Sequence, residues 1–116
     1  MEHKKQNRIV ALIVFIISLL ILTITTQDSV PFWDCGEFTA AAYLLQVPHP
    51  PGAPLHSLLG RIFLMIPFYP DVAFRMNFMS ALAGAFTVLM LYLSSVIIIT
   101  KWRGIPESFI DKLIVY

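Results

Sequence analysis

Two long apolar runs without a charged residue constrain this chain more than any other feature. The first covers residues 9–24 and, with the two threonines that follow, approaches the roughly 20 residues that a membrane-spanning helix needs. The second, about residues 78–99, contains Gly84 and several alanines and serines, which often mark close helix packing in membranes. Since 58% of the residues are hydrophobic and 13% are charged, the composition is typical of an integral membrane protein. We predict an all-α membrane protein with spans at about 9–26 and 78–99.

The basic residues lie mainly at the two ends of the chain. Cytoplasmic flanks of membrane spans carry an excess of lysine and arginine, so this distribution predicts that both termini are cytoplasmic. Residues 27–77 would then form an extracytoplasmic loop, and residues 100–116 a cytoplasmic tail. Lys4, Lys5 and Arg8 precede the first span, Lys101, Arg103 and Lys112 follow the second, and Arg61 and Arg75 lie in the loop.

The N-terminal run also resembles the core of a secretory signal peptide. Residues 25–28, Thr-Thr-Gln-Asp, lack the small-x-small pattern of a cleavage site, so an uncleaved anchor is the better interpretation.

Cys35 is the chain's one cysteine, which excludes an intrachain disulfide and a multi-cysteine metal site. A formal net charge of +1 without a basic stripe argues against nucleic acid as a partner. Residues 1–116 are interpreted as a single membrane module, and the apolar run at 109–116 resembles the start of another span.

Two short helices are expected within the loop. An alanine-rich and leucine-rich segment at 38–46 precedes a cluster of prolines at 48–54, and prolines end a helix because they lack an amide donor. After the prolines, apolar residues recur at spacings of three and four, which predicts a helix of about 14 residues over 55–68. Too short to span comfortably, it would lie along the membrane surface or dip into the protein. Its apolar face consists of Leu55, Leu58, Leu59, Ile62, Phe63 and Ile66.

Asp34 and Glu37 follow the first span, and their spacing supports two interpretations. Asp34 is a good N-cap residue, and an acid three positions later completes a capping box that would start a helix at Cys35. The same spacing also puts both carboxylates on one side of a helix start, where they can divide general-base work and substrate contact. A purely electrostatic role is a third alternative.

Other polar and aromatic residues of the loop are weaker candidates. Trp33 offers a surface that suits a sugar ring, although interfacial tryptophans are common in membrane proteins. His49 either contacts a phosphate or bonds within the turn, and Arg75 either meets a lipid phosphate or pairs with an acid. His49 and His56 invite a metal hypothesis with Glu37, but no short ligand spacing occurs. We predict neither a metal nor a cofactor.

Together these motifs resemble the N-terminal signature of a known bacterial membrane family. The resemblance rests on Phe32–Phe38, His49–Leu55, Arg75–Asn77 and the pair Ser80 and Ala81. That family contains a domain of unknown function related to animal transmembrane protein O-mannosyltransferases, within the GT-C superfamily. The resemblance implies that this chain is the N-terminal part of a longer, multi-spanning enzyme in a bacterial inner membrane. Such an enzyme transfers a sugar, mannose in the related proteins, from a polyprenyl-phosphate donor to a protein or glycan hydroxyl.

The resemblance also implies a role for each candidate. Asp34 would be the general base that deprotonates the acceptor hydroxyl, and Glu37 would orient the acceptor or tune Asp34. Arg75, helped by His49, would offset the charge that grows on the departing phosphate. Cys35 stands where the family is expected to have a small residue such as serine. The helix over 55–68 would border a groove for the polyprenyl chain.

A non-catalytic alternative comes from a different class of protein. In this reading the chain is a small membrane subunit whose outer loop docks a partner and whose carboxylates only cap a helix. A transporter or channel is a weaker alternative, because neither span contains an ionisable residue in its interior, as an ion or proton pathway often requires.

Overall fold

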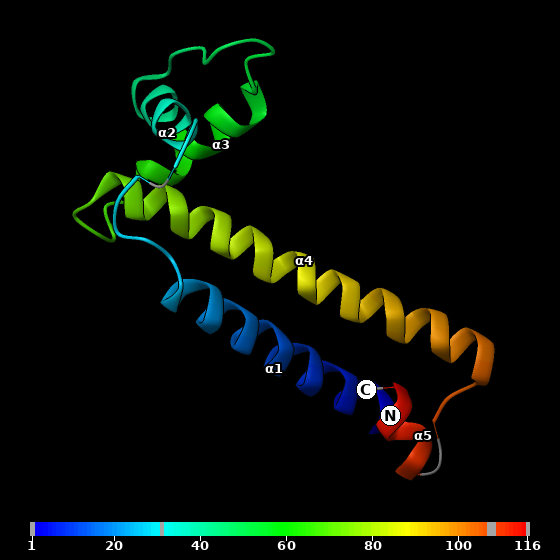
Figure 1. The fold of residues 1–116 in the computed structure, drawn as a ribbon. Coiled ribbons are helices and arrows are strands. Elements are labelled where there is room, and N and C mark those ends of the chain that lie inside the picture. Colours follow the sequence, from blue (N-terminus) through cyan, green and yellow to red (C-terminus); the bar gives the residue numbers. More distant parts are fainter. Residues whose placement is uncertain (1, 31, 107–108, 116) are drawn as a thin grey trace. The chain divides into compact units, whose positions relative to one another are not determined.

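The computed structural model describes residues 2–30, 32–106 and 109–115, and these residues form five helices without a β-strand (Figure 1). The predicted all-α fold is therefore confirmed. Pro31, beside the acidic motif, and Tyr116, at the end of the predicted tail, lie outside the described residues. The helices are α1 (Glu2–Ile24), α2 (Cys35–Leu44), α3 (Pro54–Leu64), α4 (Val72–Arg103) and α5 (Phe109–Val115).

Two of these helices are long and apolar enough to cross a membrane. They are α1, which covers residues 9–24 of the span predicted at 9–26, and α4, which covers the span predicted at 78–99. The chain divides into two compact units, and the first combines residues 1–22 with 83–116. Within this unit α1 contacts α4, because the rings of Phe15 and Phe86 lie 4.9 Å apart. In addition, the Tyr92 hydroxyl donates a hydrogen bond of 2.9 Å to Oδ1 of Asn7.

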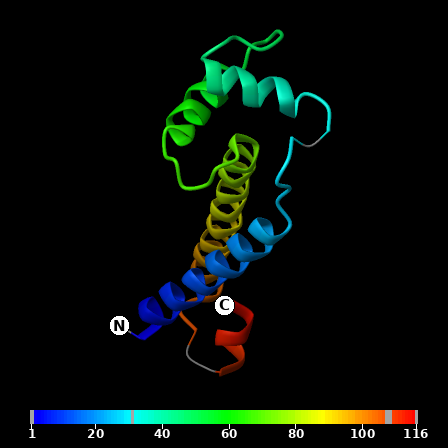
Figure 2. The same cartoon turned by 90° about the vertical axis from the view of Figure 1, so that its left-hand side faces the viewer.

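The second unit, Thr23–Leu82, contains α2, α3 and the first turns of α4. Helices α2 and α3 lie side by side in both views (Figures 1 and 2). The core of the second unit is small and consists of Ala42, Leu64 and Met76. Gly60 makes the close approach possible, since a Cβ atom there would lie 2.9 Å from the Cβ of Ala42 and 3.0 Å from Met76. This unit carries the candidate site.

Helix α3 is shorter than the predicted 14 residues, because it ends at Leu64 after 11 residues. Pro67 disfavours the α conformation at Ile66. In addition, Arg75 donates hydrogen bonds to the carbonyl oxygens of Leu64 and Ile66. Most of the predicted apolar face is exposed, while Ser57 and Gly60 are buried. Phe63 is the exception, because its ring lies 5.5 Å from that of Phe68 and 6.2 Å from that of Phe78. The exposed residues include Leu55, Leu58, Leu59 and Ile62.

Helix α4 begins before the predicted span and therefore includes the candidate residue Arg75. Oδ1 of Asp71 accepts a hydrogen bond of 2.9 Å from the backbone N–H of Phe74, which is the geometry of an N-cap. The sequence predicts a loop over residues 27–77. Instead, Arg75 and Asn77 lie in the first two turns of α4.

Candidate functional site

The site is built around the start of α2. Asp34 stands at the N-cap position of α2, but its backbone is already helical, and its side chain makes no capping hydrogen bond. Trp33 precedes it with a φ of 65°, in the left-handed region that a bulky residue rarely adopts. Such a conformation costs on the order of 1–2 kcal/mol. The chain thus enters α2 through a strained residue, and the Asp34 carboxylate makes no hydrogen bond to the backbone N–H groups at the start of the helix.

Glu37 is bound to His49 instead of to the start of its own helix. Oε1 of Glu37 accepts a hydrogen bond of 2.6 Å from the backbone N–H of His49, and Oε2 lies 2.9 Å from Nδ1 of the same residue. The predicted capping box is therefore wrong for the side chains of both acids. Its physical competitor is a pair of charge-assisted hydrogen bonds, which are stronger than the neutral bonds of an ordinary cap.

The pairing changes the titration of both partners. The hydrogen bond from the His49 ring, followed by the one from the His49 backbone, lowers the pKa of Glu37 from its ordinary 4.5. The hydrogen bond to Glu37, followed by the negative charges of Glu37 and Asp34, raises the pKa of His49 from 6.5. An ionised carboxylate can only accept, so Nδ1 of His49 is the donor. The second ring nitrogen, Nε2, is then the atom available to a ligand.

Asp34, Glu37 and His49 form one cluster. Each offers an oxygen or nitrogen atom, and these atoms lie within 4.8 Å of one another. A divalent cation bound to carboxylate and imidazole groups suits such a spacing. His56, which the sequence had grouped with His49 and Glu37, is not part of this cluster. That no metal takes part in the chemistry stays a prediction.

The other two candidates lie in different environments. Trp33 is 85% exposed, so its indole is available to a ligand or a membrane surface. Arg75 is only 8% exposed. Its Nη1 donates to the carbonyl oxygens of Leu64, at 2.8 Å, and Ile66, at 3.3 Å, and its Nε has no partner among the described residues. Arg75 is therefore occupied with the end of α3, and its contact with a phosphate stays a prediction.

Phe38, which the sequence places in the motif at 32–38 without a role of its own, contacts two histidines. Its ring meets the ring of His49 edge-on, with the centroids 5.7 Å apart, and the ring of His56 in the same way at 5.6 Å. Phe38 thus joins the acidic cluster to the start of α3. The spacing of four residues between Asp34 and Phe38 was the available signal, because such residues share one side of a helix.

Comparison with known proteins agrees with the family resemblance that the sequence motifs indicate. The family model of the "Protein O-mannosyl-transferase TMEM260 N-terminal domain" matches residues 34–114. The protein O-mannosyl-transferase tmem260 of Dictyostelium discoideum is 32% identical over 91% of this chain and 13% of its own length. Its counterpart from Mus musculus is 38% identical over 62% of this chain and 10% of its own length. The chain therefore spans a small part of these relatives. No solved structure matches it.

Proposed function

This chain belongs to the protein O-mannosyl-transferase TMEM260 N-terminal domain family, and from that premise we propose that it is the N-terminal part of a membrane glycosyltransferase. The relatives' names support the transfer of mannose to protein. In the proposal the donor is a polyprenyl-phosphate sugar, and the acceptor is a hydroxyl of a protein or glycan on the extracytoplasmic side. The full enzyme has a GT-C-like, multi-spanning fold. A bacterial inner membrane stays part of the prediction.

The observation that carries this proposal is the cluster of Asp34, Glu37 and His49 at the start of α2. Asp34 acts as the general base. It takes the proton of the acceptor hydroxyl while that oxygen forms a bond to the anomeric carbon, and the bond from that carbon to the phosphate oxygen breaks. A carboxylate suffices because the proton is lost only as the new bond forms. The absence of a capping bond to the Asp34 side chain favours this role over the structural one.

Glu37 acts on His49 in this scheme, which refines its expected role of orienting the acceptor. Its two hydrogen bonds fix the imidazole and favour the protonated form, as the raised pKa of His49 indicates. The imidazolium then offers its Nε2–H to the departing phosphate, where negative charge grows in the transition state. Because the guanidinium of Arg75 is engaged with α3, His49 is the better placed of the two cations.

The test compares wild type with Asp34→Asn at matched abundance, in membranes that carry the longest form of the protein. Transfer of mannose from a polyprenyl-phosphate donor should fall by about 10²–10⁴-fold, the usual contribution of a general base. Asp28→Asn is the matched control, since Asp28 is an exposed acid of the same loop and lies outside the cluster. Unchanged transfer in Asp34→Asn contradicts the assignment of the base.

The alternative is the non-catalytic subunit that docks a partner through its outer loop. The exposed apolar face of α3 favours it, since exposed apolar patches often mark interaction sites. In that case Asp34→Asn leaves transfer unchanged in membranes that contain the partner. A substitution of the exposed leucines of α3 would instead lower the abundance of the complex.

A further inference from the structure

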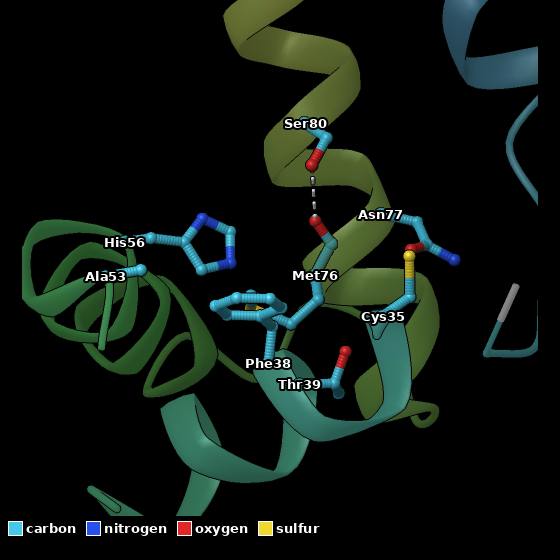
Figure 3. Close-up of a pocket in the computed structure, with 8 residues that line it drawn as sticks. All are labelled: Cys35, Phe38, Thr39, Ala53, His56, Met76, Asn77 and Ser80. Carbon is cyan, nitrogen blue, oxygen red and sulfur yellow. Dashed lines mark hydrogen bonds between the residues drawn. The ribbon is translucent and has the colours of Figure 1, made fainter. Parts of the chain in front are cut away.

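A pocket of about 380 Å³ opens beside the acidic cluster, entirely within the second unit. Its walls come from the first turns of α2, the start of α3 and the first turns of α4. Figure 3 shows the rings of Phe38 and His56 directed toward one another, with Met76 beside them. The lining residues are Cys35, Phe38, Thr39, Ala53, His56, Met76, Asn77 and Ser80.

The pocket lining combines apolar surface with polar groups whose hydrogen-bonding atoms are not all used within the protein. The Phe38 ring and the Met76 side chain provide a surface against which the C–H faces of a sugar can pack. Among the described residues, neither the Thr39 hydroxyl nor the His56 ring makes a hydrogen bond. Asn77 uses its Nδ2 on the carbonyl oxygens of residues 27 and 29. This fixes the amide and leaves its Oδ1 as an acceptor.

Phe38 connects this pocket to the proposed reacting groups. One edge contact of its ring is with His49 of the cluster, and the other is with His56 of the pocket. Cys35, another lining residue, directly follows Asp34. A ligand in the pocket therefore lies next to both the proposed base and the imidazole that meets the phosphate.

We propose that this pocket binds the hexose ring of the glycosyl donor, with Thr39, His56 and Asn77 contacting its hydroxyl groups. This assignment rests on the proposed function. The volume lies at the small end of the roughly 300–1,000 Å³ of small-molecule sites, which suits one sugar unit. The isoprenoid part of the donor fits less well, because it would leave several polar groups of the pocket without partners, and unpaired buried groups are unfavourable.

Cys35 provides a direct test, because it lines the pocket, is exposed and is the one cysteine of this chain. The rate at which N-ethylmaleimide alkylates Cys35 is measured by mass spectrometry in membranes. Three probes are compared: polyprenyl-phosphate mannose, the same polyprenyl phosphate without sugar, and a peptide rich in serine and threonine. The sugar donor should slow alkylation at least about fivefold at saturation, and the other two should not. Equal protection by the sugar-free lipid, protection by the peptide, or no protection overturns the proposal.

Paired variants test the polar contacts. Thr39→Val removes the hydroxyl while keeping the shape, and Thr39→Ser retains the hydroxyl as the matched control. Loss of one hydrogen bond should raise the donor concentration needed for half-protection, and the KM for donor, about three- to tenfold. The kcat should change much less. Equal values for wild type and Thr39→Val, with His56→Phe also unchanged, contradict the proposal.

Asp34→Asn separates this proposal from the proposed function. If Asp34 is the base, this variant loses transfer but still shows sugar-dependent protection of Cys35. Protection with unchanged transfer would leave the sugar pocket standing and refute the base. Loss of transfer in Asp34→Asn with no protection of Cys35 in wild type would refute the sugar pocket alone.

Discussion

Glu37 and His49 hold each other in place across twelve residues of the outer loop. One bond comes from the ring of His49 and the other from its backbone, so the pair fixes the proline-rich turn as well as the imidazole. Both side chains are about half exposed, and solvent therefore weakens the attraction between their charges. The pair therefore positions the two side chains more than it stabilises the fold. Its contribution to the stability of the protein should depend on pH.

The difference in stability between wild type and Glu37→Gln should be largest between about pH 4.5 and 6.5. The pKa of Glu37 is lowered, so its contribution is complete above the ordinary 4.5 and is lost as the pH falls through the lowered value. The pKa of His49 is raised, so its contribution is complete below 6.5 and is lost as the pH rises through the raised value. Thermal unfolding in lipid nanodiscs, followed by tryptophan fluorescence, measures the difference.

Asp28→Asn is the control for this pH series, because it removes a carboxylate from the same loop without touching the pair. Its difference from wild type should lack a maximum between pH 4.5 and 6.5. A constant difference for Glu37→Gln across the range would mean that the pair does not form in the folded protein.

At the scale of helices, α2 and α3 are held together by small side chains. Gly60 of α3 faces Ala42 of α2 and Met76 of α4, and these contacts leave no room for a further carbon atom. Of the α3 leucines, Leu55, Leu58 and Leu59 are exposed, whereas Leu64 is buried in the core. Stability in this unit therefore depends on close approach of the helices as well as on the burial of Leu64 and Met76.

Gly60→Ala should destabilise the protein although alanine favours a helix. The gain in helix propensity is about 1 kcal/mol, whereas overpacking typically costs about 1–3 kcal/mol. Because the added carbon would lie 2.9 Å from the Cβ of Ala42, which cannot rotate away, overpacking should dominate. The midpoint of thermal unfolding should fall.

Gly84→Ala is the matched control, since its nearest neighbour is Cδ1 of Leu22 at 3.0 Å. That atom ends a flexible side chain and can move, so the control should unfold nearer to the wild-type temperature. Destabilisation by both substitutions to the same extent would show that the contact with Ala42 is not decisive.

At the scale of the whole molecule, the distribution of charge predicts that both termini face the cytoplasm and that the loop faces the other side. A membrane-impermeant maleimide should therefore label Cys35 in sealed vesicles whose extracytoplasmic face is outward. In the double variant Cys35→Ser and Lys101→Cys, labelling should require permeabilisation. Labelling in the reverse pattern would invert the predicted orientation and remove Asp34 from the extracytoplasmic side.

The sequence was sufficient for features that depend on local pattern. The charge-free runs predicted the two long helices, and the spacing of apolar residues predicted α3 with its apolar face. It was not sufficient for contacts between segments far apart in the chain. Glu37 matched a capping pattern, and only the folded turn shows that His49 competes for its carboxylate. The early end of α3 depends in the same way on Arg75, which comes from the next helix.

The exposure of Leu55, Leu58, Leu59 and Ile62 on α3 has a practical consequence. When residues 23–82 are produced alone as a water-soluble domain, the preparation will expose a continuous row of leucine and isoleucine side chains. Such a row drives self-association in water. Crystallisation or solution NMR of residues 23–82 therefore calls for an amphiphile, even though this segment contains only the ends of the two charge-free runs.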